Sequence, residues 1–530
     1  MRIQSHLGFV FVLLTLCMMC WGATQSVAAT IESASDRASR SILVRFKNDV
    51  RTAEVNAVST SLGARVAYSF HIVDNLHLLE LPSVEARSRA LAELARSSSV
   101  LYAEPDYLRL ALETIPNDPS FSALWALKQA SDRDIDATDA WDITQGDSSV
   151  VVGVIDTGIY YPHEDLGENM WVNQAEATGQ PGADDDGNGY VDDIYGIDAI
   201  GIDSDPIDTS DCEHGTHVTG TIGAVGNNGK GVVGVNWRVK LMALRVMEYI
   251  TALGGCGGPD SGFLRCLEYT IDMKRRGVNV VATNNSWGGP YYGRALYDAI
   301  EANLREGILF VAAAGNDGWD NDTYPSYPAD YQLPNVVSVA ASTSTDTMAS
   351  FSEYGRHTVH LGAPGVNITS TTVSPAYEGG WNGTSMAAPH VTGTIALLKA
   401  QNPGRDWKAL KNLVLAGVEP MPAFANTIAG GRLNAHLSMT CSGRRISGRL
   451  RPTTSMMTCA PGENITLSML SIDCDRPDDQ GGLTVTVPGG VISLSDDGRG
   501  GGPGIWRRHL QCALAGTTRA WDVRNRLSRR

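Results

Sequence analysis

Residues 41–105 carry a pattern of apolar and polar positions that predicts a small α+β module. Alternating or continuous apolar runs indicate strands, and apolar residues three or four apart indicate helices. The predicted strands span 41–46, 64–70, 76–81 and 100–104, and the predicted helices span 52–62 and 84–96. The order β-α-β-β-α-β is that of a ferredoxin-like module, which by itself indicates no function.

From residue 117 onward, continuous apolar runs alternate with helical patterns. Strands that are apolar on both faces and separated by helices predict an α/β fold with helices flanking a parallel sheet. The main strands are 149–155, 239–245, 278–284 and 308–313, and the main helices are 215–224, 263–275, 293–306 and 385–400. After about residue 436 the helical pattern ends, and the segments 464–470 and 483–487 predict strands of a small β-rich appendage.

The first 29 residues have the layout of a secretory signal peptide. Arg2 precedes an apolar run from Leu7 to Trp21, and the small residues at 26–29 offer a cleavage site. An N-terminal anchor is the alternative, although the run is short for a membrane span. We therefore expect a secreted protein, extracellular or periplasmic, with no membrane segment.

Net charge and cysteine content narrow the possible partners and cross-links. The formal net charge of −16 argues against nucleic acid as a partner, because phosphate binding needs a basic surface. Of the nine cysteines, Cys17 and Cys20 leave with the signal peptide, and the odd number that remains leaves at least one thiol unpaired. Cys256 and Cys266 flank a glycine-rich loop and are the predicted local bridge, with two separate buried thiols as the alternative.

Three segments offer the groups of a serine hydrolase in one order along the chain. An apolar strand ends at Asp156 in Val-Ile-Asp-Thr-Gly, His214 opens His-Gly-Thr-His, and Ser385 lies in Gly-Thr-Ser-Met-Ala at a helix N-terminus. Amide hydrolysis by a serine needs a base for the hydroxyl and a carboxylate that orients the base. Separately, these segments could be half of an aspartic protease site, a metal-binding histidine pair and a helix N-cap. Together, in this order, they indicate a catalytic triad.

The three segments resemble the signatures of the subtilase family, over roughly residues 117–436. The resemblance implies that Asp156 orients the imidazole, His214 is general base and then general acid, and Ser385 is the nucleophile. It also implies that His217 is structural. Asn316, at the end of Ala-Ala-Ala-Gly-Asn, resembles the family's oxyanion-hole residue, although a turn asparagine after a strand is the alternative.

The same resemblance implies where a peptide substrate binds. The expected substrate-binding strand and the wall of the primary specificity pocket contain Ser286, Trp287, Gly288, Ala313 and Gly315. An extended peptide adds to such a strand through main-chain hydrogen bonds. Because few charges lie in these stretches, we expect large apolar or aromatic side chains before the scissile bond.

An acidic segment between Asp156 and His214 predicts a structural calcium site. Asp184, Asp186, Asn188, Tyr190 and Asp192 take positions 1, 3, 5, 7 and 9 of a calcium loop, with the Tyr190 carbonyl as one ligand. Tyr195 stands where a closing glutamate is usual, so further ligands must come from elsewhere. The candidates nearby are Asp193, Asp203, Asp205 and Asp208. A solvated acidic loop is the alternative.

The β-α-β-β-α-β module resembles the inhibitor propeptide of the subtilase family. The expected organisation is therefore a signal peptide (1–29), a propeptide (30–113), a peptidase domain (114–438) and an appendage with an Arg-rich tail (439–530). The resemblance implies a secreted serine endopeptidase made as a self-processing precursor. We expect a monomer whose partners are protein or peptide substrates and its own propeptide. A calcium-dependent adhesin and an inactive scaffold on the same fold are the alternatives.

Overall fold

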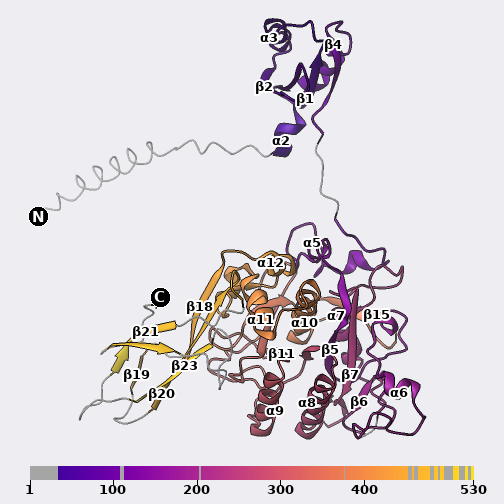
Figure 1. Cartoon of the computed structure of the whole chain (residues 1–530), viewed down its shortest axis with the longest axis vertical. Coiled ribbons are helices and arrows are strands. Elements are labelled where there is room, and N and C mark those ends of the chain that lie inside the picture. The colour runs from indigo at the N-terminus through magenta and orange to yellow at the C-terminus, as the bar shows by residue number, and fades with distance from the viewer. Residues whose placement is uncertain are drawn as a thin grey trace, which may run out of the picture. The chain divides into compact units, whose positions relative to one another are not determined.

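In the computed structural model the chain divides into two compact units, residues 1–112 and 113–530 (Figure 1). The described residues are 34–107, 113–201, 204–209, 211–252, 254–374, 376–451, 456–458, 464–477, 483–487, 490–494, 505–511, 520–522 and 527–529. The predicted signal peptide lies outside them. Within these ranges, none of the helices combines the length and the apolar character needed to cross a membrane.

The first unit contains the strands and helices that the apolar pattern predicted. The elements are α2 (Ala34–Ser39), β1 (Ser41–Phe46), α3 (Thr52–Ser61), β2 (Arg65–Ser69), β3 (Leu76–Glu80), α4 (Val84–Leu94) and β4 (Val100–Pro105). Its sheet has the order β2-β3-β1-β4, and each neighbouring pair is antiparallel. Alternate residues of β1, Ile42, Val44 and Phe46, are fully buried because one face of the sheet packs on α3 and α4.

A largely parallel sheet forms the centre of the second unit. Among the described residues it has nine strands in the order β16-β17-β13-β12-β11-β10-β5-β7-β6. Only the edge pair of β16 and β17 is antiparallel. The strands are β5 (Gly146–Asp156), β6 (Gly196–Asp198), β7 (Arg238–Arg245), β10 (Val280–Asn285), β11 (Leu309–Ala313), β12 (Val336–Ser342), β13 (Leu361–Pro364), β16 (Glu419–Pro420) and β17 (Gly431–Arg432).

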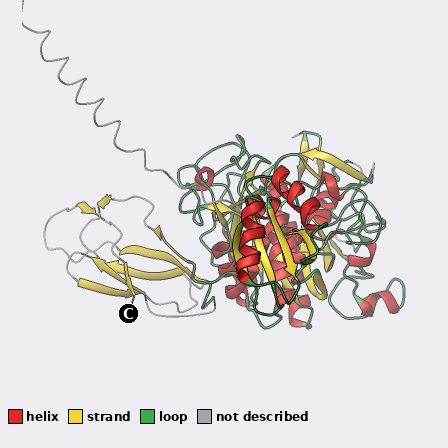
Figure 2. Ribbon diagram, turned by 90° about the horizontal axis from the view of Figure 1, so that it is seen from above, coloured by secondary structure: helices red, strands yellow, loops and turns green. Residues whose placement is uncertain are grey.

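Helices cover both faces of this sheet, as its doubly apolar strands require (Figure 2). Val152 and Val154 of β5 belong to the core shared with α7 and α10, whereas Val151 and Ile155 belong to the core shared with α8 and α9. The helices of this unit are α5 (Ala137–Trp141), α6 (Gln174–Thr178), α7 (His214–Gly223), α8 (Asp260–Arg275), α9 (Arg294–Arg305), α10 (Thr384–Gln401), α11 (Trp407–Ala416) and α12 (Ala435–Thr440).

Two hairpins of the second unit were not predicted from the sequence. One joins β8 (Glu248–Ile250) to β9 (Gly255–Gly257), and the other joins β14 (Ile368–Thr371) to β15 (Tyr377–Trp381). All four strands are short, and β9 and β15 contain glycines, so neither hairpin has a clear alternating pattern. Both hairpins contribute residues to the cleft described below.

The predicted bridge between Cys256 and Cys266 is wrong, and so is its alternative of two buried thiols. Cys256, in β9, forms a disulfide with Cys212, two residues before His214. Cys266 faces the core from α8 as a buried free thiol, and burial raises its pKa. The short spacing between Cys256 and Cys266 therefore predicted the wrong pairing, because helix α8 directs Cys266 into the core and away from the hairpin that carries Cys256.

The C-terminal region is rich in strands. The described strands are β18 (Arg445–Arg451), β19 (Met456–Thr458), β20 (Asn464–Asp473), β21 (Leu483–Val487), β22 (Gly490–Leu494), β23 (Ile505–Gln511), β24 (Ala520–Asp522) and β25 (Leu527–Arg529). Leu470 and Ile472 of β20 join the core that contains α10 and α11. A disulfide between Cys441, which follows α12, and Cys474, which follows β20, links the two segments covalently.

Candidate active site

Three elements bring the predicted triad residues to one cleft. Asp156 is the last residue of β5, His214 is the first residue of α7, and Ser385 lies in the first turn of α10. His214 Nδ1 is 2.7 Å from Asp156 Oδ1, and His214 and Ser385 line the same cleft. Residues at the carboxyl ends of parallel strands meet at one edge of the sheet, which accounts for this convergence.

Asp156 is held in place by its neighbours in the chain. It is fully buried, and its Oδ1 also accepts a hydrogen bond from the backbone N–H of Thr157 at 2.8 Å. The Thr157 hydroxyl accepts from the N–H of Gly215 at 2.8 Å, which fixes the start of α7 beside the end of β5. The carboxylate can therefore orient the His214 ring through Nδ1 and leave Nε2 available for proton transfer.

The pKa of His214 reflects opposing effects. Burial alone would lower this pKa, but the charge and hydrogen bond of Asp156, together with the charge of Asp208, outweigh burial and raise it. His217, one helical turn later, is fully buried and stacks on Trp381 with ring centroids 4.4 Å apart. Burial and the nearby His214 lower the pKa of His217 to about 3, so it stays neutral beneath the site.

Ser385 is fixed against the segment that follows β10. Its hydroxyl donates to the backbone carbonyl of Ser286 at 3.1 Å, and the Ser286 hydroxyl donates to the carbonyl of Ser385 at 2.8 Å. In this rotamer Ser385 Oγ is hydrogen-bonded to Ser286 rather than to His214. A rotation about Cα–Cβ is therefore needed for attack, in keeping with catalytic hydrogen bonds that tighten only when substrate binds.

The orientation of the Asn316 amide follows from its bonds to Thr384. Asn316 Oδ1 accepts from the backbone N–H of Thr384 at 2.9 Å and from its hydroxyl at 3.0 Å. The amide nitrogen consequently faces away from Thr384. A β-carbon built on Gly383 would lie 3.7 Å from Asn316 Nδ2 and 3.7 Å from Ser385 Cβ, so both groups border Gly383. Such a donor can meet an oxyanion formed beside Ser385.

All five predicted substrate-binding residues line the cleft, whose volume is about 830 Å³. They are Ser286, Trp287, Gly288, Ala313 and Gly315. The indole of Trp287 donates to the Ile155 carbonyl at 3.0 Å and stacks on Phe263, so this wall is rigid. Sequence reasoning missed Ser326, Tyr327 and Glu353, which also line the cleft but come from segments without a recognised motif.

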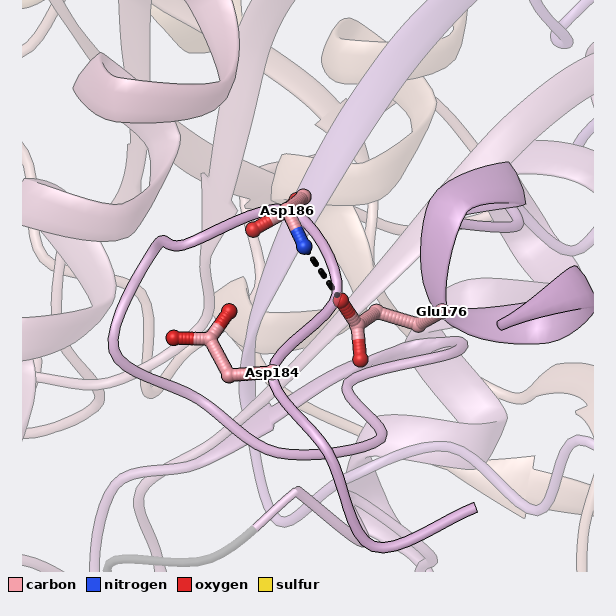
Figure 3. A group of neighbouring side chains, drawn as sticks. All are labelled: Glu176, Asp184 and Asp186. Atoms are coloured by element: carbon pink, nitrogen blue, oxygen red, sulfur yellow. Dashed lines mark hydrogen bonds between the residues drawn. The ribbon is translucent and has the colours of Figure 1, made fainter. Parts of the chain in front are cut away.

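The predicted calcium loop brings two of its proposed ligands together with a third residue from α6. One oxygen from each of Glu176, Asp184 and Asp186 lies within 4.8 Å of the other two (Figure 3). Glu176 is almost fully buried, and it also accepts hydrogen bonds from the N–H groups of Asp186 at 3.0 Å and Asp192 at 3.1 Å. Carboxylate oxygens are ligands that Ca²⁺ prefers, so these three residues fit that ion.

Of the other predicted loop ligands, Asn188 contacts the group directly, because its backbone N–H donates to Asp184 Oδ1 at 3.1 Å and to Asp186 Oδ1 at 2.9 Å. The Asn188 amide nitrogen donates to Asp193 at 2.8 Å, and the Tyr190 ring packs against Tyr269. Asp192 Oδ2 accepts from the N–H of Gly182 at 2.7 Å and lies outside the group of three. Glu176 had no sequence signal, because it precedes the loop and belongs to a short helix.

The additional candidate calcium ligands that the structure describes have hydrogen-bond partners of their own. Asp193 is buried and bonded to Asn188 and Tyr269, and burial raises its pKa to about 6. Asp208 accepts from the backbone N–H of Thr216 at 3.0 Å and from its hydroxyl at 2.6 Å, so it stabilises the start of α7. Asp203 lies outside the described residues, and Asp205 accepts from the Tyr161 hydroxyl at 3.1 Å.

The hydrogen-bonded pair of Asp156 and His214 adjoins a cleft that also contains Ser385 and Asn316. This set of groups is typical of the serine hydrolase class. Residues 147–428 match the profile of the subtilase family, Peptidase_S8, and the chain belongs to this family of serine peptidases. It is 31% identical over 321 residues to thermitase of Thermoactinomyces vulgaris, covering 61% of this chain and 98% of that protein. It is 32% identical over 400 residues to a thermophilic serine proteinase of Bacillus sp. strain AK1, covering 75% of this chain and 87% of that protein.

Longer relatives match a smaller share of their own length. Subtilisin-like protease 1 of Plasmodium berghei is 34% identical over 333 residues, which is 59% of this chain and 53% of that protein. The chain thus spans about half the length of this relative.

Proposed function

We propose that this protein is a secreted serine endopeptidase that hydrolyses peptide bonds of proteins through an acyl-enzyme on Ser385. The observation that carries the proposal is the 2.7 Å bond between Asp156 and His214 in a cleft that also contains Ser385. In the first step Ser385 Oγ attacks the scissile carbonyl carbon, and His214 Nε2 takes the hydroxyl proton. Asp156 stabilises the imidazolium that forms. His214 then gives the proton to the leaving amine, and water hydrolyses the ester by the reverse roles.

Stabilisation of the oxyanion is assigned to two donors. The first is Asn316 Nδ2, which is turned away from Thr384 because the amide oxygen accepts both bonds from that residue. The backbone N–H of Ser385, in the first turn of α10, is the second donor, and the positive end of a helix favours negative charge there. An extended substrate would pair with the main chain of Ser286–Gly288 and place its scissile carbonyl between these donors.

A fluorophosphonate probe tests this function directly. The wild-type protein should be labelled on Ser385 and should cleave a denatured protein substrate, because both reactions need an activated serine. Ser385→Ala should lose the label and the cleavage, while Ser350→Ala, at an exposed position outside the cleft lining, should retain both. A wild-type protein that neither takes the label nor cleaves would favour an inactive scaffold or an adhesin.

A structural calcium ion is proposed at Glu176, Asp184 and Asp186. The support is the convergence of three carboxylates, whose mutual repulsion a divalent cation would neutralise. Glu176→Gln should weaken calcium binding, measured by isothermal titration of the chelator-treated protein. Asp185→Asn is a matched control, since Asp185 lies between two members of the group but accepts from the N–H of Gln180 instead. Equal affinity in all three proteins would contradict the assignment.

Residues 30–113 are proposed to be an inhibitor propeptide that the enzyme removes itself. The support is the resemblance of the β-α-β-β-α-β unit to subtilase propeptides and its place directly before the peptidase domain. The precursor should cut its own chain near residue 113, and the released segment should inhibit in trans. Purified Ser385→Ala protein should stay uncut. If it is processed in the absence of other proteases, self-cleavage is wrong.

A further inference from the structure

The cleft contains a buried carboxylate that the proposed reaction mechanism does not use. Glu353 lines the cleft, although only 3% of this residue is exposed. The walls beside it, Gly288 and Gly315, are exposed to a greater degree. Glu353 is therefore the most buried of these three cleft-lining residues.

Gly315 is the point where the wall and the carboxylate touch. A β-carbon built on Gly315 would lie 2.2 Å from Glu353 Oε2 and 2.5 Å from Oε1, and the backbone has φ of +125° there. Glu353 also donates its backbone N–H to the Gly315 carbonyl at 3.0 Å. Only glycine fits both the contact and the conformation, so the chain brings the carboxylate directly against the pocket wall.

No cation of the described chain neutralises this carboxylate. Glu353 Oε2 is buried and has no hydrogen-bond partner among the described residues, and no described lysine, arginine or histidine pairs with Glu353. Burial raises the pKa of Glu353, and hydrogen bonds from the backbone N–H of Asp317 and from the side chains of Asn321 and Ser326 lower it in part. The neighbouring Asp330 is also buried, and burial followed by the charge of Glu353 raises its pKa to about 8.

The rest of the cleft has the same sign of charge. Asp260 and Asp317 line it as well, and the described lining residues include no lysine or arginine. A buried acceptor without a partner is costly, and a substrate cation that supplies the missing donor recovers that cost on binding. An apolar side chain in the same pocket would leave Glu353 Oε2 desolvated and without a partner.

We propose that Glu353 is a specificity-determining residue that selects substrates with arginine or lysine immediately before the scissile bond. This inference rests on the proposed peptidase function, and it replaces the apolar preference that the sequence of the pocket walls predicted. The methylene groups of the substrate side chain would pass between Gly288 and Gly315, and its charged end would meet the Glu353 carboxylate.

Matched peptides that differ only at the residue before the scissile bond test this proposal. Wild-type kcat/KM should be about tenfold or more higher for arginine or lysine than for phenylalanine, as expected for a charge-assisted hydrogen bond. Glu353→Gln, which keeps the shape of the side chain, should lose about ten- to hundredfold for the basic peptides and less than about threefold for phenylalanine. Asp260→Asn is the control, because this lining carboxylate is exposed, and the ratio should change by less than about threefold.

The outcomes separate the specificity proposal from the proposed function. Labelling of Ser385 together with a wild-type preference for phenylalanine or leucine would overturn the role of Glu353 and leave the peptidase function intact. An unchanged basic-to-apolar ratio in Glu353→Gln would also overturn it. Absence of both labelling and cleavage for every peptide would refute the function itself. If Glu353→Gln does not fold, the wild-type profile alone still decides.

Discussion

Asn316→Ala should reduce kcat strongly and leave the fold nearly unchanged. The proposed function gives the wild-type side chain two separable roles, since its oxygen accepts two bonds from Thr384 and its nitrogen is the proposed oxyanion donor. Asn316 is exposed, so water can replace the lost bonds to Thr384, and the free energy of unfolding should fall by about 1 kcal/mol or less. Loss of one oxyanion donor, however, costs about 10²–10³ in kcat, a range known from subtilisin.

The assay is steady-state hydrolysis of one peptide substrate, paired with thermal unfolding. KM should change little, because the amide nitrogen meets charge that develops mainly in the transition state. Asn316→Asp is a sharper variant, since its oxygen can still accept from Thr384 whereas its second oxygen would repel the oxyanion. Its kcat should be at least as low as that of Asn316→Ala.

Two results would refute this reasoning. A rise in KM with an unchanged kcat would mean that Asn316 binds the ground state and not the oxyanion. A Thr384→Val protein with the same loss as Asn316→Ala would mean that the start of α10, rather than the amide donor, controls the rate. The Thr384→Val change keeps the backbone N–H that bonds Asn316, so only a partial loss is expected.

Three further predictions test the proton transfer, the precursor and the ion. His214 must be neutral to accept a proton, and Asp156 raises its pKa, so kcat/KM should rise with pH through a value above 6.5. Asp156→Asn should move this rise in kcat/KM to lower pH. Ser385→Ala should accumulate with residues 30–113 attached, as seen by intact mass, while wild type releases them. Chelation should lower the melting temperature, since a ligand at a hundredfold excess over Kd stabilises by about 2.7 kcal/mol. Glu176→Gln should abolish that shift, and an equal shift in this variant would place the ion elsewhere.

Much of the fold was predictable because its elements have strong local signals. The run that ends at Asp156 is apolar on both faces, and the predicted strand 149–155 lies within β5. The helix predicted at 385–400 is α10, extended by one residue at each end. Long periodic runs of this kind fix the type of element, and capping or fraying decides only the last residues.

The parts of the site that escaped prediction depend on contacts between distant segments. Glu176 and Glu353 reach their sites from residues outside any motif, and only the packed chain brings them to Asp184 and Gly315. Cys212 pairs across the cleft rim with Cys256, which no spacing rule identifies. Local patterns specify which face of an element is buried, but they do not specify which distant segment covers that face.

The geometry of the cleft is coupled to the core by a buried polar chain. The Thr392 hydroxyl of α10 donates to Asn284 Oδ1 at 3.0 Å, and the Asn284 amide donates to the Ser286 hydroxyl at 3.0 Å. Ser286 in turn exchanges hydrogen bonds with Ser385, so the nucleophile and the substrate-binding strand share one network.

This network determines what must stay constant for catalysis. Asn284 lies in β10, whose neighbours are β5, which ends at Asp156, and β11, which leads to the Gly315 wall. Three adjacent parallel strands thus lead to Asp156, the Ser286–Gly288 segment and Gly315, and α10 places Ser385 against them. Because buried polar groups bond only in one arrangement, a shift of α10 relative to β10 would break bonds that water cannot replace. The position of Ser385 relative to the Ser286–Gly288 segment is therefore set by the core of the molecule.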